Sequence, residues 1–293
     1  MKDTADMRKL NPQVPTKSAP EKAEAVFNLS QVTFQYPGGS MALDSLDLLV
    51  GRGESLGILG ANGCGKSTLL EILDGLLFPA WGHYEAFGRE ITEENLSHEE
   101  ANRQFRSLVG LVFQRSDVQL FCPTVRDELS FGPLQLDLPK EQVIERIRDV
   151  MTLLEIDQLA DRAPFSLSGG EKKKVAIGSV LTMNPDVLLL DEPGNELDPR
   201  TQAWLMEFLL QLKGAGKTLV IATHDLGMVD EICDRVLILG ENHRMLAVGP
   251  TSTLLGTPEL LLKANLIHEH YHHHGGVIHR HLHGHDLGHQ HKH

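Results

Sequence analysis

Residues 60–68 read Gly60-Ala61-Asn62-Gly63-Cys64-Gly65-Lys66-Ser67-Thr68, a glycine, four free positions and then Gly-Lys-Ser. This is the pattern of a phosphate-binding loop. The run before it, from 54 to 59, predicts a buried strand, and the run after it, from 69 to 73, predicts a helix. Because glycines let successive backbone N–H groups converge on an anion at a helix N-terminus, we expect all nine residues to hold a nucleotide. Lys66 is expected to reach the β- and γ-phosphates, and the Ser67 hydroxyl a Mg²⁺ ion.

The chain has three cysteines, Cys64, Cys122 and Cys233, at wide spacings. An odd number of widely spaced thiols is typical of a reducing compartment rather than of a disulfide framework. Cys64 lies within the phosphate-binding loop. This position suggests the hypothesis that alkylation of its thiol blocks nucleotide binding sterically.

The whole chain of 293 residues carries a net charge of -13 and has 41% hydrophobic residues, which is typical of an acidic globular protein. A nucleic-acid-binding surface needs a basic patch, and the sequence has no basic run of that kind. We therefore expect no nucleic-acid partner. The sequence also lacks a stretch of about 18 apolar residues and an apolar signal core near Met1. We expect a cytoplasmic protein that does not itself span a membrane.

The pattern along the chain predicts three parts. Residues 1–25 hold three prolines among polar residues, so we expect a flexible extension. Residues 26–262 alternate short apolar runs with helical patterns, and residues 263–293 are rich in histidine. Within the middle part, residues 139–155 predict an amphipathic helix with an apolar face of Val143, Ile144, Ile147, Met151 and Leu154.

Residues 187–190 form an apolar run that predicts a central strand buried on both faces of a parallel sheet. Asp191 and Glu192 end this run, and the carboxyl ends of such strands line the ligand crevice of an open α/β sheet. We expect Asp191 to hold Mg²⁺ through its water shell. We expect Glu192 to accept a proton from the water that attacks the γ-phosphate. Two adjacent carboxylates at a buried strand end are costly without a cation.

Further positions are candidates for nucleotide contacts. His224 follows the predicted strand 218–223 at the same sheet edge; a histidine there is more often structural, yet its imidazole can bond a phosphate oxygen. Tyr36 ends a predicted strand, where its ring either stacks on adenine or is simply half-buried. Ser168 is a natural N-cap, and Gly169 and Gly170 let the backbone approach a ligand closely.

The chain from about residue 26 to 262 resembles an ABC transporter ATPase. The resemblance rests on five motifs in order: the loop at 60–68, Gln114, the stretch 167–171, the pair Asp191-Glu192, and His224. It implies the α/β fold of a P-loop NTPase, with a mostly parallel core sheet, an N-terminal antiparallel β subdomain and a helical subdomain at about 115–175. It also implies catalytic roles for Glu192, His224 and Gln114, with Gln114 as an additional Mg²⁺ ligand.

The resemblance further implies a head-to-tail dimer that sandwiches two ATP molecules. Each lies between the phosphate loop of one subunit and the Ser168-Gly169-Gly170 stretch of the other. A second helix N-terminus that faces the γ-phosphate makes ATP, but not ADP, hold the subunits together. Hydrolysis is therefore expected to open the dimer. The sequence leaves open whether this is a homodimer or a heterodimer with a second ABC ATPase.

Residues 112–121, followed by Pro123-Thr124-Val125 and Phe131-Gly132-Pro133, are similar to the energy-coupling-factor subgroup, especially its cobalt and nickel uptake systems. In that subgroup this region docks on a membrane-embedded coupling subunit, beside a substrate-binding membrane subunit. The similarity implies a peripheral protein at the cytoplasmic face of the cell membrane.

Two departures from the family pattern have different weight. Gly194, Asn195 and Glu196 stand where small and hydroxyl residues are usual, and the charge of Glu196 near the dimer seam is expected to weaken closure or alter its Mg²⁺ dependence. Glu171 replaces a glutamine, which matters less because backbone amides bind the phosphate.

Twelve of the 16 histidines lie between His268 and His293. Neutral imidazoles at this density bind first-row transition metals, with affinity rising toward Ni²⁺, Cu²⁺ and Zn²⁺. The alternatives are a cloned tag, which is usually uninterrupted, and a merely solvated tail. We expect the tail to buffer or sense Ni²⁺ or Co²⁺, with binding that fades below about pH 6.5. The candidate ligands are His268, His270, His272, His273, His274, His279, His281, His283 and His285.

These features together predict the ATP-hydrolysing subunit of an importer for nickel or cobalt, with ATP and Mg²⁺ as cofactors. The ATPase of a vitamin importer with the same coupling factor is the alternative, and the histidine tail argues against it. A soluble ABC ATPase that acts on DNA or the ribosome is a different class. That class predicts a coiled-coil insertion, a duplicated ATPase or a basic surface, and the sequence has none of these.

Overall fold

The computed structural model describes residues 25–274 and 277–284, and beyond residue 267 it describes the backbone alone. The expected flexible extension at 1–25, except for its last residue, lies outside the described residues, as does the candidate ligand His285.

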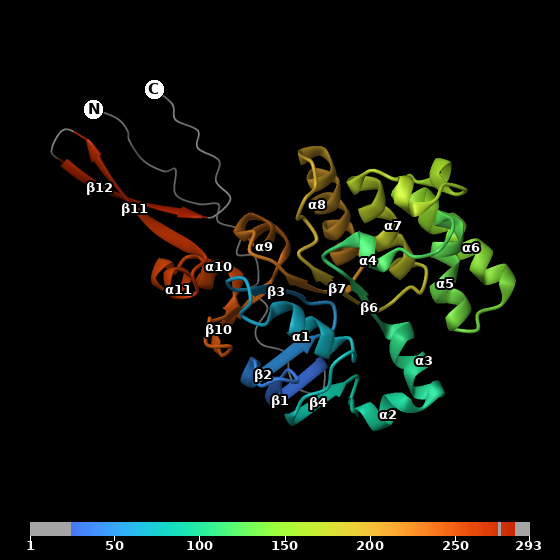
Figure 1. The fold of residues 1–293 in the computed structure, drawn as a ribbon, viewed down its shortest axis with the longest axis horizontal. Coiled ribbons are helices and arrows are strands. Elements are labelled where there is room, and N and C mark those ends of the chain that lie inside the picture. The colour runs from blue at the N-terminus through green and yellow to red at the C-terminus, as the bar shows by residue number, and fades with distance from the viewer. Residues whose placement is uncertain (1–24, 275–276, 285–293) are drawn as a thin grey trace, which may run out of the picture.

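Six strands form the central sheet, in the order β10-β9-β3-β8-β7-β6 (Figure 1). The neighbours from β9 to β6 pair in parallel, and β10 is antiparallel to β9. The expected mostly parallel core sheet is confirmed. The strands are β3 (Ser55–Leu59), β6 (Val109–Val112), β7 (Val187–Asp191), β8 (Thr218–Ala222), β9 (Arg235–Leu239) and β10 (Met245–Pro250).

Strand β7 shows why continuous hydrophobicity predicts this position. Val187 and Leu189 belong to one hydrophobic cluster, and Leu188 and Leu190 belong to the other. Because successive residues of a strand face opposite sides of the sheet, both faces must be covered by apolar elements. Burial of each such side chain contributes about 1.5–3 kcal/mol to the stability of the fold. This burial fixes which residues form the strand, and therefore where the carboxylates at its end lie.

A second, antiparallel sheet has the order β2-β1-β4-β5 and packs with helix α1 on one face of the central sheet. It is the expected N-terminal antiparallel subdomain. Its strands are β1 (Ala25–Gln35), β2 (Met41–Gly51), β4 (Trp81–Ala86) and β5 (Arg89–Glu90). Along the chain, three helices lie between β3 and β6. They are α1 (Lys66–Leu73), α2 (Glu93–Ser97) and α3 (Glu99–Leu108).

A group of helices follows β6 and lies together in green and yellow in Figure 1. They are α4 (Ser116–Gln119), α5 (Val125–Gln135), α6 (Lys140–Leu154), the 3₁₀ turns η2 (Asp157–Leu159) and η3 (Pro164–Ser166), and α7 (Gly169–Leu181). The predicted helix at 139–155 is α6, and four of its five expected apolar positions are buried. The exception is Ile144, which is 48% exposed because it lies one residue, or about 100°, away from the buried face.

The remaining elements complete the fold. They are α8 (Pro199–Gly214), α9 (Leu226–Ile232), α10 (Thr251–Leu255), α11 (Pro258–Lys263) and the antiparallel pair β11 (Ile267–His274) and β12 (Val277–Gly284). The β11–β12 hairpin projects away from the body of the molecule (Figure 1). Within the described part of the chain, every helix is too short or too polar to serve as a membrane span.

Candidate nucleotide-binding site

The loop at 60–68 joins β3 to α1, as its sequence predicts. Two glycines are required by space as well as by backbone angle. A Cβ at Gly65, whose φ is 113°, would lie 2.2 Å from the carbonyl oxygen of Ala42. A Cβ at Gly60 would lie 2.5 Å from Cys64 Sγ. The loop can therefore keep its backbone close to the first turn of α1, where orphan N–H groups attract an anion.

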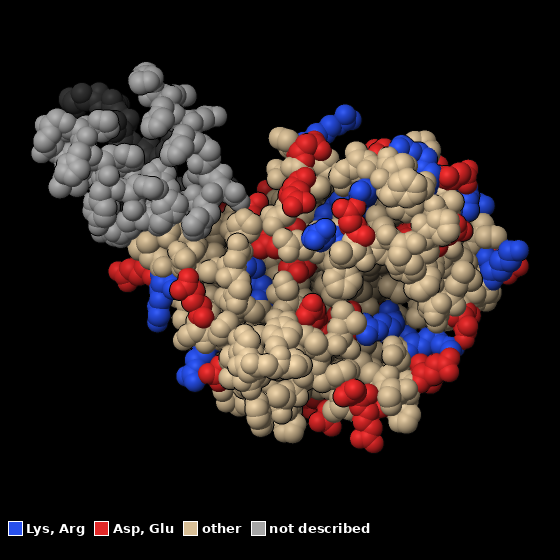
Figure 2. All heavy atoms as spheres, viewed as in Figure 1, with Lys and Arg blue, Asp and Glu red and all other residues tan. Residues whose placement is uncertain are grey.

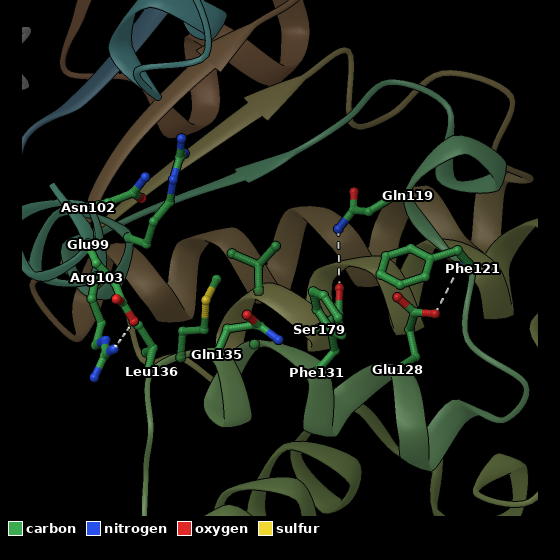
Figure 3. Close-up of a pocket in the computed structure, with 14 residues that line it drawn as sticks. Glu99, Asn102, Arg103, Gln119, Phe121, Glu128, Phe131, Gln135, Leu136 and Ser179 are labelled. Atoms are coloured by element: carbon green, nitrogen blue, oxygen red, sulfur yellow. Dashed lines mark hydrogen bonds and ion pairs between the residues drawn. The ribbon is translucent and has the colours of Figure 1, made fainter. Parts of the chain in front are cut away.

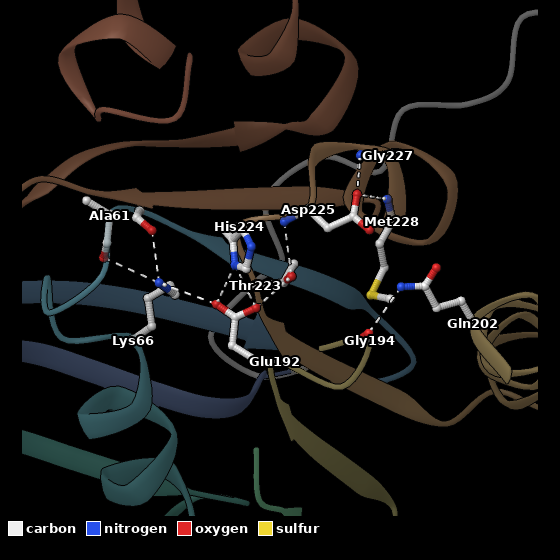
Figure 4. Close-up of polar contacts among 11 residues, drawn as sticks. Ala61, Lys66, Glu192, Gly194, Gln202, Thr223, His224, Asp225, Gly227 and Met228 are labelled. Atoms are coloured by element: carbon white, nitrogen blue, oxygen red, sulfur yellow. Dashed lines mark hydrogen bonds and ion pairs between the residues drawn. The ribbon is translucent and has the colours of Figure 1, made fainter. Parts of the chain in front are cut away.

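Lys66, the first residue of α1, is held inside the loop. Its Nζ donates to the carbonyl oxygen of Gly60 at 2.9 Å and to that of Ala61 at 3.3 Å. The same nitrogen lies 3.6 Å from Glu192 Oε1, and both side chains are buried (Figure 4). The ammonium is thus fixed at the mouth of the loop, where it can meet a phosphate.

Glu192 is oriented by two groups from the neighbouring strand end. Thr223 Oγ1 donates to Glu192 Oε2 at 3.1 Å, and His224 Nδ1 lies 3.0 Å from both carboxylate oxygens (Figure 4). Glu192 has a φ of 42°, in the left-handed region that a residue with a side chain seldom adopts. Such a conformation costs about 1–3 kcal/mol, so the surrounding contacts hold the carboxylate in place.

Asp191 has the features of a cation ligand. Its side chain is buried, and its Oδ1 has no hydrogen-bond partner among the described residues. Burial raises the pKa of Asp191, although a hydrogen bond from Ser67 acts in the opposite direction. A buried oxygen without a donor is costly unless a cation or water satisfies it. The residues present therefore fit Mg²⁺, which Ser67 and Asp191 would hold together.

A cavity of about 460 Å³ opens in front of these groups. It is lined by the phosphate loop and by Tyr36, Gln114, Glu192 and His224, which sequence reasoning also selected. Tyr36 is 38% exposed, and its hydroxyl lies 2.9 Å from Thr68 Oγ1. Its ring thus lies at the rim of the phosphate loop. Stacking of this ring on adenine stays a prediction. The other lining residues, which sequence reasoning missed, are Ser40, Met41, Ala42, Asn195 and His243.

Ser168, Gly169 and Gly170 do not line this cavity. Ser168 is the N-cap of α7, as predicted, and it forms a capping box with Glu171. Hydrogen bonds from Ser168 lower the pKa of Glu171. The helix terminus at Ser168, which the sequence predicts to bind the phosphate of a second subunit, therefore lies outside the pocket of its own chain.

The thiol of Cys64 is buried beneath the phosphate loop. Its side chain is 1% exposed and belongs to the hydrophobic cluster beneath the loop. Burial raises the pKa of its thiol. Because a thiol reacts as the exposed thiolate, we expect alkylation of native Cys64 to be slow, and the hypothesis that its modification blocks nucleotide binding stays a prediction. Cys64 can contribute to nucleotide binding through its backbone, not through its sulfur.

Sequence reasoning also missed Lys173 and Thr223. Lys173 lies in a run of three lysines that looks like a solvated helix face, yet it is 2% exposed and donates to the carbonyl oxygen of Gln114 at 3.1 Å. The only sequence signal was the position of this run five residues after Ser168. Thr223 precedes His224 directly, so its place at the strand end was available as a signal. Together with the phosphate loop, these strand ends define the site of a P-loop nucleoside triphosphatase.

Comparisons with known proteins identify the family. The sequence profile of the ABC transporter family matches residues 43–195. A putative ABC transporter ATP-binding protein of Methanosarcina acetivorans is 49% identical over 253 residues, 85% of this chain and 92% of that protein. The nickel import ATP-binding protein NikO of Rhodobacter capsulatus is 47% identical over 244 residues, 82% of this chain and 95% of that protein.

A solved structure agrees with these relatives. The structure of cbiO1 from Clostridium perfringens, part of the ABC transporter complex cbiONQ, has a TM-score of 0.71 and 34% identity, and the match covers 83% of this chain and 95% of that chain. The chain belongs to the ABC transporter ATP-binding family, and it is an ATPase.

Proposed function

We propose that this chain is the ATP-hydrolysing motor subunit of an energy-coupling-factor importer that takes up nickel or cobalt. It acts as a dimer at the cytoplasmic face of the membrane, beside a membrane-embedded coupling subunit and a substrate-binding membrane subunit. The observation that carries the proposal is an exposed aromatic groove that is tied by hydrogen bonds to the Gln114 end of β6.

The groove is a cavity of about 500 Å³ between α3, α5 and α7 (Figure 3). Phe121 and Phe131 border it and are 66% and 43% exposed, with ring centroids 5.0 Å apart in an edge-to-face arrangement. Exposed aromatic pairs of this kind are typical of protein contact sites. Buried Glu128 accepts the backbone N–H groups of Phe121 and Cys122 at 2.9 and 2.8 Å, so the aromatic loop is anchored before any partner arrives.

Gln119 connects the groove to the nucleotide site. Its Oε1 accepts the backbone N–H of Phe113, the residue before Gln114, at 3.1 Å. Its Nε2 donates to the carbonyl oxygen of Ala176 at 2.8 Å and to Ser179 Oγ at 3.2 Å, both on α7. A segment that enters the groove therefore presses on two elements at once, the Gln114 loop and the helix that begins at Ser168. We assign residues from about 115 to 175 to the helical subdomain, which transmits the pressure of the docked segment to these two elements.

Hydrolysis in this proposal uses groups already in position. Glu192 accepts the proton of the attacking water, and His224 and Thr223 hold its carboxylate. Lys66 stabilises the phosphate charge, and Gln114 faces the same cavity. Mg²⁺, when bound at Ser67 and Asp191, neutralises charge on the phosphates. The Ser168-Gly169-Gly170 terminus of a second subunit completes the site, because this chain's own terminus lies outside it.

The choice of metal over vitamin rests on the nickel import protein NikO as a relative and on the histidine-rich end of the chain. Figure 2 shows acidic and basic side chains interspersed on the face in view, without the continuous basic patch that nucleic acid needs.

The decisive experiment combines purification with uptake. The chain should copurify from membranes with a multi-span partner, and cells that carry the intact complex should accumulate labelled nickel or cobalt, whereas Glu192→Gln cells should not. Uptake of a labelled vitamin in place of metal would establish the alternative importer. Recovery only from the soluble fraction, with nucleic acid bound, would overturn the proposal.

We also propose that the β11–β12 hairpin binds Ni²⁺ or Co²⁺ beside the transporter. The backbone register sets His268 opposite His283, His270 opposite His281 and His272 opposite His279. The backbone register thus places several histidine positions of the two strands directly opposite one another, and imidazole is a ligand that Ni²⁺ and Co²⁺ accept.

Calorimetry tests the hairpin proposal by comparing the full chain with a chain that ends at Ile267. Ni²⁺ binding should disappear in the shortened chain, and in the full chain it should fade as pH falls below about 6.5, because protonated imidazole cannot bind metal. Undiminished binding by the shortened chain would contradict the proposal.

A further inference from the structure

The turn between β9 and β10 contacts the phosphate loop through His243. Its side chain borders the nucleotide cavity, and its Nδ1 lies 3.4 Å from the carbonyl oxygen of Cys64. Because a carbonyl oxygen only accepts, Nδ1 carries the proton and donates it to this bond. The same hairpin also approaches the start of the loop, since a Cβ at Gly60 would lie 2.8 Å from the carbonyl oxygen of Leu239. One hairpin thus contacts the loop at two points.

Backbone contacts fix His243 in an unusual conformation. Its φ of 62° lies in the left-handed region, which a residue with a side chain seldom adopts. Its N–H donates to the carbonyl oxygen of Gly240 at 3.0 Å, and its own carbonyl oxygen accepts the N–H of Asp44, on β2, at 2.9 Å. The next residue, Arg244, donates from Nε to Asp44 Oδ2 at 2.7 Å. The imidazole therefore approaches the loop from a turn that is fastened to β2.

The peptide bond that His243 holds, between Cys64 and Gly65, stands among glycines. Gly63 and Gly65 have φ values of 81° and 113°, and glycine adopts positive and negative φ with similar ease. This peptide can therefore rotate at low cost, because no side chain restricts φ at Gly65. In a planar trans peptide, the carbonyl of Cys64 and the N–H of Gly65 point in opposite directions. A donor that holds the carbonyl therefore also sets the direction of the N–H.

We propose that His243 is a positioning residue that holds this peptide with the Gly65 N–H directed at the phosphates of the nucleotide. Gly65 is the N-cap of α1 and borders the nucleotide cavity, so its N–H is one of those that the helix itself leaves unsatisfied. Without the imidazole, the peptide has a second orientation, in which its carbonyl oxygen faces the anion and repels it. His243 disfavours this orientation before the nucleotide arrives, and it strengthens phosphate binding without touching the reacting atoms.

Three substitutions at position 243 separate a hydrogen bond from side-chain bulk. ADP binding to the purified full-length chain is measured by calorimetry without divalent cation, and ATP turnover is measured with Mg²⁺. His243→Ala should weaken ADP binding and raise KM for ATP about fivefold, as expected for one lost hydrogen bond, while kcat stays within about twofold. His243→Asn, which keeps an N–H donor two bonds from Cβ, should stay near wild type. His243→Asp, which has the same shape but only accepts, should bind ADP at least as weakly as the alanine variant.

Asn242→Ala is the matched control, because Asn242 lies in the same turn and its Oδ1 accepts the N–H of Arg244 at 3.4 Å. It should leave ADP affinity within about twofold of wild type. Equal losses in the two alanine variants would show that a loosened turn is responsible and would overturn the proposal. An asparagine variant as weak as the alanine variant would also overturn it. If His243→Ala does not fold, His243→Asn and His243→Asp decide the question.

Nuclear magnetic resonance of the isotope-labelled chain supplies the positional readout, through the amide signal of Gly65. Saturating ADP should shift this signal strongly downfield in wild type and in His243→Asn, because the N–H then donates to a phosphate. The shift should be much smaller in His243→Ala, even when the site is filled. Equal shifts in wild type and His243→Ala would rule out the positioning role. These measurements concern nucleotide binding by the chain itself, so their outcome is independent of what the importer carries.

Discussion

The nucleotide cavity and the aromatic groove lie on either side of the Gln114 loop, and they are lined by side chains of different chemistry. In the cavity, Lys66 and Glu192 are 6% and 5% exposed and already paired. In the groove, Phe121 and Phe131 are largely exposed and present hydrocarbon to solvent. The nucleotide cavity therefore needs a charged ligand that separates an ion pair already formed, whereas the aromatic groove needs a protein surface that covers its exposed rings.

The largest effect is expected from a change in the nucleotide cavity. Glu192→Gln removes the proposed general base and should lower ATP turnover by about 10² to 10⁴, while ATP binding is retained. Because ATP then persists, the closed dimer should accumulate, which size-exclusion chromatography with ATP and Mg²⁺ would detect. Binding of a partner in the groove should be unchanged. Full turnover in this variant would show that another group accepts the proton.

The groove also borders an ion pair between the partly exposed Arg106 and the buried Asp74. Arg106 borders the groove, and its Nη1 donates to Asp74 Oδ2 at 2.6 Å and to the carbonyl oxygen of Asp74 at 2.7 Å, at the end of α1. Burial raises the pKa of Asp74 from its ordinary value of 3.8 to about 6, although Arg106 acts against this rise.

A raised carboxyl pKa means that the folded state holds a proton which the unfolded state has lost. The free energy of unfolding should therefore fall as pH rises from about 4 to about 6, by roughly 3 kcal/mol from this group, and then level off. Urea unfolding across this range measures it. Asp74→Asn should remove this part of the pH dependence, and an identical slope in both proteins would contradict the assignment.

A smaller effect is expected at the groove itself. Phe131→Ala should weaken binding of the membrane partner about tenfold, because an exposed aromatic anchor is lost, and should leave the ATPase activity of the isolated subunit unchanged. Leu210→Ala, which truncates a 37% exposed side chain on α8 away from the groove, is the control. Surface binding assays with the detergent-solubilised partner compare the two. Equal losses would remove the groove from the docking site.

The smallest functional effect is expected at Cys64. Brief treatment of the native chain with N-ethylmaleimide at pH 7 should leave ATP binding intact, because the thiol is buried beneath the loop and its pKa is raised. Mass spectrometry should find Cys64 modified at least about tenfold more slowly than in the urea-unfolded chain. Rapid native modification would mean that the loop opens in solution.

The phosphate loop with its flanking strand and helix, the buried strand before position 191 and the carboxylates at 191 and 192 were predictable from sequence. The reason is local: an apolar run sets a buried strand, and the polar residues that follow it must lie at the strand's carboxyl end. Ser168 as an N-cap was predictable for the same reason. The prediction failed for Ile144, which is exposed one position from a buried face.

The sequence by itself thus determined a nucleotide-binding ATPase of the ABC family and indicated the candidates for its reacting groups. Only the tertiary structure decided how those groups are held: Glu192 between Lys66 and His224, Gln119 between β6 and α7, and Lys173 against Gln114. Apart from the bond between Gln119 and Phe113, which spans six positions, these contacts join residues from 32 to 126 positions apart. Local periodicity reports which face of an element is apolar, and it carries no information about which distant polar group will meet a given charge.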